Sequence, residues 1–222
     1  MYALKCKNYV FDLDGTLVDS MKPAVKIVLD YLDEHGVKYE PSIVKILTPL
    51  GFRGISVYYA TELGVSVPAE EIYADFVTRL KKVYASEIAL KDGVYKALIA
   101  LKTQGARLNV LTASPHVFTD DCLKNLGVYE LFENVWTAED FGMLKSDARI
   151  YGEVAKRLNV NIEECVMVDD SLRVLKTAKS AGMQTVGVYE ASTSDEWEEI
   201  IKTADRSVLG FDELLRVVCA EN

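Results

Sequence analysis

Basic residues are outnumbered in this sequence. The chain of 222 residues has 25 lysines and arginines against 34 aspartates and glutamates, which gives a formal net charge of −9. Proteins that bind nucleic acid carry basic patches, and anionic membrane surfaces also attract basic segments, so this balance argues against both partners. A substrate that is itself an anion must therefore be attracted by a local group of cations.

Cysteine is scarce, and long apolar runs are missing. The four cysteines, Cys6, Cys122, Cys165 and Cys219, are far apart and form no CxxC pair, so we expect reduced, mostly buried thiols instead of disulfides or a zinc site. No apolar run reaches the roughly 18 residues that a membrane span needs. The segment before the first predicted strand, residues 1–7, is short and polar, unlike a secretory leader. We therefore expect a cytoplasmic protein.

Four short runs of apolar and β-branched residues predict buried strands, and helical periodicity follows each of them. The runs are Asn8–Asp12, Arg107–Leu111, Cys165–Asp169 and Gln184–Val188. This alternation predicts an α/β fold, a Rossmann-like doubly wound parallel sheet with helices on both faces. Ligands of such open sheets bind beyond the carboxyl ends of the strands.

The stretch from residue 19 to residue 89 breaks this alternation, because no strand can be recognised in it. Apolar residues recur at helical spacing near both of its ends, and glycines and prolines separate shorter pieces. We expect a core domain made of residues 1–18 and 90–222. Residues 19–89 are expected to be inserted as a helical-bundle cap that lies over the site.

An acidic motif, Asp12-Leu-Asp14-Gly15-Thr16, follows the first predicted strand. Alternate residues of a strand point the same way, so the carboxylates of Asp12 and Asp14 project together from its carboxyl end. Like charges this close need a cation or a shared proton, and carboxylate oxygens are ligands that Mg²⁺ prefers. Gly15 permits an unusual backbone turn after the pair. Such a motif arises by chance at roughly one position in 10⁵.

The segment Phe11–Ser20, FDLDGTLVDS, closely resembles the first motif of the haloacid dehalogenase-like hydrolases. The resemblance implies that Asp12 is a nucleophile that becomes transiently phosphorylated and that Asp14 is the general acid and base. It also implies Mg²⁺ bound by Asp12, the backbone carbonyl of Asp14 and a later aspartate. Gly15 and Thr16 are assigned to phosphate binding.

The second and third motifs of the family are matched further along the chain. The sequence LTASP ends the second predicted strand and assigns Thr112 and Ala113 to phosphate oxygens. Lys145 resembles the lysine of the third motif, whose ammonium holds the phosphoryl oxygens, with Ser146 in place of the usual proline. A helix cap at Thr112 and a solvated lysine at position 145 are the alternative interpretations.

The fourth motif is acidic and ends the third predicted strand, in the sequence VMVDDS. The resemblance assigns Asp170 to the metal and leaves Asp169 beside the metal ligands rather than among them. Val174 departs from the family pattern, in which an aspartate is common near that position. We expect Asp169 to compensate for this departure.

The sequence therefore predicts a Mg²⁺-dependent phosphatase of this family that acts on a small phosphorylated metabolite and is a monomer or a weak dimer. Phosphoglycolate, sugar phosphates and nucleoside monophosphates all fit the motifs. Arg53 stands between two glycines in an expected cap loop, from which it would reach a second anionic group of the substrate.

Two other functions fit the same fold: a phosphosugar mutase and a catalytically silent binding protein. Mutases of this kind carry a histidine about a dozen residues after the nucleophile, where this chain has Ala24, and this difference favours hydrolysis. A dehalogenase would lack Asp14, because its leaving group needs no proton. The departures at Ser146 and Val174 are what keep the binding protein as an alternative.

Overall fold

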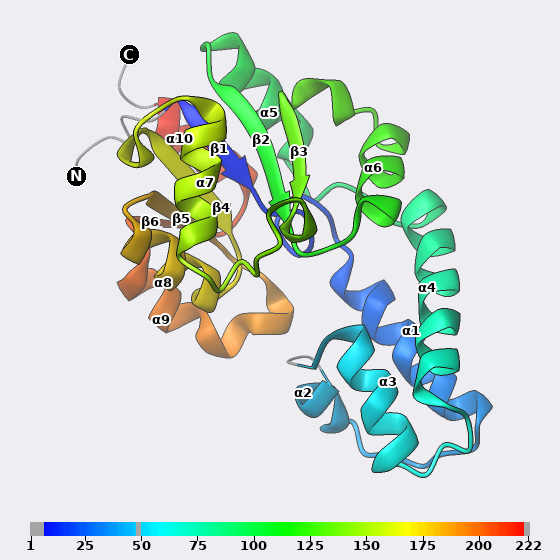
Figure 1. The fold of residues 1–222 in the computed structure, drawn as a ribbon. Coiled ribbons are helices and arrows are strands. Elements are labelled where there is room, and N and C mark those ends of the chain that lie inside the picture. The colour runs from blue at the N-terminus through cyan, green and yellow to red at the C-terminus, as the bar shows by residue number, and fades with distance from the viewer. Residues whose placement is uncertain (1–6, 48–49, 220–222) are drawn as a thin grey trace. The chain divides into compact units, whose positions relative to one another are not determined.

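The computed structural model describes residues 7–47 and 50–219, and the side chains of residues 217–219 are not described. The chain divides into two compact units, one of Met1–Asp19 with Ala89–Asn222 and one of Ser20–Ile88. Figure 1 shows the order of the elements along the chain. Among the described residues, no helix is both long and apolar enough to cross a membrane.

The larger unit is built on a parallel sheet. Within the described residues the sheet has six strands in the order β3-β2-β1-β4-β5-β6, and every neighbouring pair is parallel. The strands are β1 (Asn8–Phe11), β2 (Arg107–Thr112), β3 (Asn134–Thr137), β4 (Cys165–Asp169), β5 (Gln184–Val188) and β6 (Arg206–Val208). This arrangement confirms the predicted parallel α/β fold.

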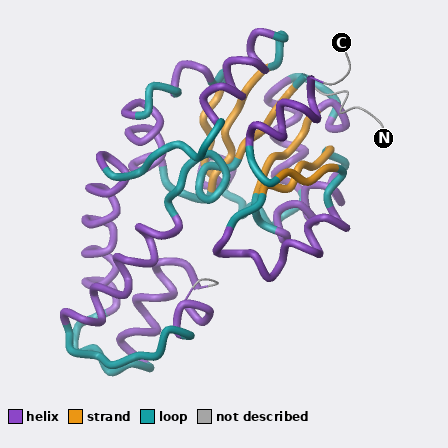
Figure 2. The backbone as a smooth tube through the Cα atoms, turned by 180° about the vertical axis from the view of Figure 1, so that it is seen from behind, coloured by secondary structure: helices purple, strands orange, loops and turns teal. Residues whose placement is uncertain are grey.

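Helices cover both faces of this sheet (Figures 1 and 2). One face carries α5 (Val94–Thr103), α6 (His116–Asn125), η2 (Tyr129–Leu131) and α10 (Phe211–Cys219). The other face carries α7 (Arg149–Leu158), α8 (Leu172–Ala181) and α9 (Trp197–Thr203). The short helices η3 (Ala138–Phe141), η4 (Ile162–Glu164) and η5 (Ala191–Glu196) lie in the connections.

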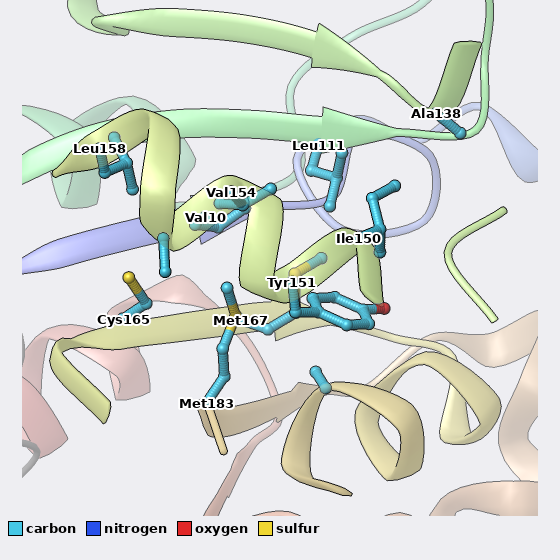
Figure 3. Close-up of a cluster of buried hydrophobic side chains, with 12 residues drawn as sticks. Val10, Leu111, Ala138, Ile150, Tyr151, Val154, Leu158, Cys165, Met167 and Met183 are labelled. Atoms are coloured by element: carbon cyan, nitrogen blue, oxygen red, sulfur yellow. The ribbon is translucent and has the colours of Figure 1, made fainter. Parts of the chain in front are cut away.

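The two faces of β1 show why its residues after Asn8 are apolar or aromatic. Val10 packs with Ile150 and Val154 of α7 in a buried cluster (Figure 3), while the next residue, Phe11, lies near the ring of Phe211 in α10. Successive strand residues point to opposite faces, so a strand covered on both sides needs apolar residues at every position. The same reasoning holds for β4, in which every residue is buried.

Two edge strands, β3 and β6, were not predicted from the sequence. Each pairs with only one neighbouring strand, and their residues are mostly half-buried. Polar residues such as Asn134 and Arg206 are tolerated there, so no apolar run marks either strand.

Helices are the only regular secondary structure in the described residues of the smaller unit. Its helices are α1 (Met21–Glu34), α2 (Ile43–Leu47), α3 (Gly51–Thr61) and α4 (Ala69–Ser86). The ring of Phe76 meets those of Tyr31 and Tyr59 edge-on at centroid distances of 5.3 and 5.9 Å. The buried Tyr59 hydroxyl donates to the carbonyl of Val28 at 2.8 Å, which satisfies its polar group inside this core.

The chain leaves the larger unit and returns to it at adjacent points. Val18 and Leu90 form an antiparallel bridge. The amide of Asp19 donates to the carbonyl of Ala89, and the amide of Lys91 donates to the carbonyl of Leu17, both at 3.0 Å. These contacts hold the two connecting segments against each other.

The described thiols lie in the larger unit. Cys122 and Cys165 are buried free thiols, and burial raises the pKa of each. Cys6 and the side chain of Cys219 lie outside the described residues.

Candidate active site

The carboxyl ends of β1 and β4 meet at the centre of the sheet. The chain runs from β1 outward through β2 and β3 and then returns to β4 on the other side of β1. The amide of Asp12 continues the pairing by donating to the carbonyl of Val168 at 2.9 Å. Such a reversal of strand order is where open α/β sheets bind their ligands.

Three buried carboxylates gather at this edge. Oxygens of Asp12, Asp169 and Asp170 lie within 4.8 Å of one another. The buried ammonium of Lys145 donates to Asp12 Oδ1 at 2.5 Å and to Asp169 Oδ2 at 2.7 Å. Tyr151 donates its hydroxyl to the carbonyl of Lys145 at 2.6 Å and so holds the lysine's backbone. The structure thus brings together residues from three of the four sequence motifs.

The remaining residues of the first motif fix the carboxylate of Asp170. Thr16 donates from Oγ1 to Asp170 Oδ1 at 3.1 Å. Gly15 has a φ of +80°, and a Cβ at this position would lie 2.7 Å from Asp170 Oδ2. Position 15 therefore requires glycine both for its backbone conformation and for the close approach of the carboxylate.

Burial and mutual repulsion change the pKa values of the groups in this cluster. Burial raises the pKa of Asp12 well above its usual value; Lys145 opposes this rise, and Asp169 and Asp170 add to it. Burial, with a further contribution from Asp169, raises the pKa of Asp170 to about 7. Burial alone would lower the pKa of Lys145, but Asp12 and Asp169 outweigh it and raise that pKa.

The cluster fits a metal ion that prefers oxygen ligands. When all three carboxylates are ionised, the single ammonium of Lys145 balances only one of their charges. Buried uncompensated charge is unfavourable, and a divalent cation would remove it. Asp169 lies within the group rather than behind it, although its oxygens already accept from Lys145 and from the amide of Ser171.

The departure at Val174 has a structural explanation. This residue is half-buried and packs against the apolar cluster that contains Val10 and Met167. The position therefore contributes to the core under α8. That Asp169 compensates for the missing carboxylate stays a prediction.

The second motif reaches the site through Asp14. Ser114 donates from Oγ to Asp14 Oδ2 at 2.5 Å, a contact that the sequence analysis missed. The buried Thr112 accepts the amide of Ser114 at its Oγ1 at 3.0 Å, and Ala113 between them is exposed. Thr112 and Ala113 thus directly precede the serine that contacts Asp14, at the carboxyl end of β2.

The expectation of a loop at Arg53 was wrong. The residue lies in α3, because Gly51, with a φ of +62°, begins this helix instead of interrupting the chain. The Arg53 guanidinium pairs with Glu70 at 3.2 Å and lies 4.4 Å from the centroid of the Tyr73 ring. Arg53 belongs to the helical unit, whereas the carboxylate cluster belongs to the larger one.

Lys91 is a second residue that the sequence analysis missed. Its ammonium donates to the carbonyl of Gly15 at 2.7 Å, to the carbonyl of Tyr189 at 3.1 Å and to Glu190 Oε2 at 2.7 Å. Glu190 is nearly buried, and burial alone would raise its pKa; the ion pair with Lys91 and the hydrogen bonds from Ser192 together outweigh burial and hold the pKa below its usual value. This lysine joins the turn after Asp14 to the end of β5.

Replacing Lys91 with methionine is expected to lower the free energy of unfolding by about 2 to 4 kcal/mol, because the nearly buried Glu190 loses its cation. Urea denaturation measures this change. In the control Lys96→Met, which removes an exposed lysine 3.5 Å from Asp212, the expected change is below about 0.5 kcal/mol. Equal losses in the two variants would contradict the structural role of Lys91.

His116 lies between two carboxylates. Its Nδ1 is 2.8 Å from Asp120 and its Nε2 is 2.9 Å from Asp140. The hydrogen bond with Asp120 is the largest influence on its pKa; burial opposes it, Asp140 reinforces it, and the pKa is raised. The imidazole of His116 therefore joins α6 to η3.

His116 is expected to stabilise the folded protein at a pH below its folded pKa, where the imidazole is charged. Because its folded pKa is raised, this contribution is fully present below about pH 6.5, the unfolded value, and is lost as pH rises through the folded pKa. His116→Gln should therefore destabilise the protein more at pH 6 than at pH 9 in urea denaturation. A loss independent of pH would show that packing, and not charge, is what the side chain contributes.

Known proteins are similar to this chain in sequence and in fold. The profile of the family described as haloacid dehalogenase-like hydrolase matches residues 9–188, and the chain belongs to that family. A phosphoglycolate phosphatase of Colwellia psychrerythraea is 29% identical over 81% of this chain and 82% of its own length. A 6-phosphogluconate phosphatase of Escherichia coli is 28% identical over 78% of each chain.

A solved structure supports the same fold. The crystal structure of a Thermotoga maritima protein superposes with a TM-score of 0.80, at 22% identity, over 97% of this chain and 100% of that chain. The family and the fold predicted from the sequence motifs are confirmed, and both relatives described above are named as phosphatases.

Proposed function

We propose that this protein is a Mg²⁺-dependent phosphatase that hydrolyses a small phosphorylated metabolite through a phosphorylated Asp12. The observation that carries the proposal is the contact of Lys145 with Asp12 inside the group of three buried carboxylates. A lysine beside a nucleophilic carboxylate places positive charge where the phosphoryl oxygens gather. Two relatives are named as phosphatases of small phosphorylated acids, which supports the same class of substrate.

The residues take the following roles in this proposal. Asp12 attacks phosphorus, and Asp14 gives its proton to the leaving oxygen and later takes one from the attacking water. Lys145 and Thr112 stabilise the oxygens of the transferred group. The backbone amides of residues 16 and 113 add hydrogen bonds to the same oxygens, whereas the amide of Gly15 already donates to the carbonyl of Val18 at 3.1 Å.

Asp12, Asp170 and the backbone carbonyl of Asp14 would hold the Mg²⁺, with Asp169 beside them. The ion supplies positive charge that reduces the repulsion between a carboxylate nucleophile and a phosphate dianion. In this proposal the helical unit, residues 20–88, serves as the cap that selects the substrate, and Arg53 is its candidate contact for a second anionic group.

A phosphate-release assay with purified protein tests the proposal. The panel should include 2-phosphoglycolate, 6-phosphogluconate, sugar phosphates and nucleoside monophosphates, each with Mg²⁺ and with an excess of chelator. We expect phosphate release that depends on Mg²⁺ for at least one compound. Isomerisation of a sugar phosphate without phosphate release would support a mutase instead, and no turnover of any compound would support a binding protein.

A further inference from the structure

The hydrogen bond from Ser114 to Asp14 joins two residues that are 100 positions apart in the chain. Asp14 follows β1 and Ser114 follows β2, the neighbouring strand. The Ser114 hydroxyl donates to Asp14 Oδ2 at 2.5 Å, so the two neighbouring strand ends are joined directly by their side chains.

The backbone of Ser114 is itself held at both of its polar groups. Its amide donates to Thr112 Oγ1 at 3.0 Å, and its carbonyl accepts from Thr119 Oγ1 at 3.1 Å. Thr112 and Thr119 are both buried, so these two anchors are fixed by the packing of β2 and α6. The Ser114 hydroxyl therefore reaches Asp14 from a rigid support.

We infer that Ser114 is a positioning residue for Asp14 and fixes the orientation of this carboxyl group during proton transfer. The inference rests on the proposed phosphatase function. An aspartate side chain has two rotatable bonds, and a hydrogen bond at one oxygen restricts both. With Oδ2 held by Ser114, Oδ1 is the oxygen that gives and receives the proton.

This arrangement serves both halves of the reaction. As the bond from Asp12 to phosphorus forms, the ester bond breaks, its electron pair goes to the leaving oxygen, and that oxygen takes the proton of Asp14. Water then attacks the same phosphorus, gives a proton to Asp14, and phosphate leaves as Asp12 regains its carboxylate. Oδ2 accepts the hydrogen bond from Ser114 whether or not Oδ1 carries the proton.

Comparing two leaving groups tests the inference. The value of kcat/KM covers the steps up to departure of the leaving group. The alkoxide that leaves an alkyl phosphate must receive a proton, whereas the nitrophenolate that leaves p-nitrophenyl phosphate need not. For Ser114→Ala we expect kcat/KM to fall about 10- to 100-fold with the best alkyl phosphate of the panel. With p-nitrophenyl phosphate we expect a change of less than about threefold.

Three further variants complete the experiment. Ser114→Thr keeps the hydroxyl and should restore most of the activity toward the alkyl phosphate. Ser180→Ala removes an exposed hydroxyl that bonds only within α8 and should change neither reaction. Asp14→Ala should show the same selective loss as Ser114→Ala, but a larger one.

The outcomes separate the inference from the function on which it rests. Equal losses of Ser114→Ala with both substrates, or no loss with the alkyl phosphate, would overturn the role of Ser114 while leaving the phosphatase in place. If Asp14→Ala lost activity equally with both substrates, the assignment of Asp14 as acid would fail, and the role of Ser114 with it. If the wild-type protein hydrolysed neither compound, the proposed function itself would be rejected.

Discussion

Replacing Asp12 with asparagine is expected to lower kcat for phosphate release by about 10⁴-fold or more, because an amide cannot form the phosphorylated intermediate. The side chain is nearly the same size, so the packing around the end of β1 should persist. Phosphate release by the best substrate of the panel measures the loss. Circular dichroism and the thermal midpoint of unfolding show whether the fold is kept.

A matched control for this change is Asp212→Asn. Asp212 is an exposed aspartate that lies 3.5 Å from Lys96, and its replacement should leave turnover unchanged. If Asp12→Asn kept more than a small fraction of the wild-type rate, Asp12 could not be the nucleophile. The contact between Lys145 and Asp12 would then serve the structure alone.

Removing Mg²⁺ is the second change with a large expected effect. An excess of chelator should abolish turnover, and added Mg²⁺ should restore it, because the ionised form of the carboxylate cluster needs further positive charge. Asp170→Ala should raise the Mg²⁺ concentration at half-maximal activity by about 10-fold or more. A titration of activity with Mg²⁺ measures this shift.

Thermal unfolding measures Mg²⁺ binding at the same site independently of activity. Mg²⁺ should raise the thermal midpoint of the wild-type protein, because a ligand that binds only the folded state stabilises it, and the rise should be smaller for Asp170→Ala. The exposed Asp195 supplies the control, since Asp195→Ala should respond to Mg²⁺ as the wild type does. An unchanged Mg²⁺ requirement in Asp170→Ala would remove this residue from the set of ligands.

The centre of the fold was predictable because its physical requirements are local. β1 and β4 are buried on both faces, so each needs an unbroken apolar run, and the acidic residues directly after each run stand out against it. The meeting of Asp12, Asp169 and Asp170 follows from the pairing of these two parallel strands. Sequence motifs therefore indicated both the edge of the sheet and its carboxylates.

The supporting residues were not predictable, because their partners are distant in the chain. Lys91 meets Gly15 and Glu190 across 76 and 99 positions, and its own neighbours give no sign of either contact. Ser114 lies within the motif LTASP, but the motif assigns roles only to Thr112 and Ala113, and the partner of Ser114 is 100 positions away. Arg53 failed for a different reason, because glycines on both sides suggested a loop where one of them starts a helix.

The antiparallel bridge between Val18 and Leu90 makes the helical insert equivalent to the loop of a hairpin. The free energy of closing a loop rises by only about 0.6 kcal/mol for each doubling of its length. The stability of the sheet therefore depends only weakly on how many residues lie between Val18 and Leu90. Inserts of other lengths and sequences can therefore be grafted at this junction without shifting the register of β1 against β4. The junction therefore separates the sequence requirements of the insert from those of the carboxylate cluster.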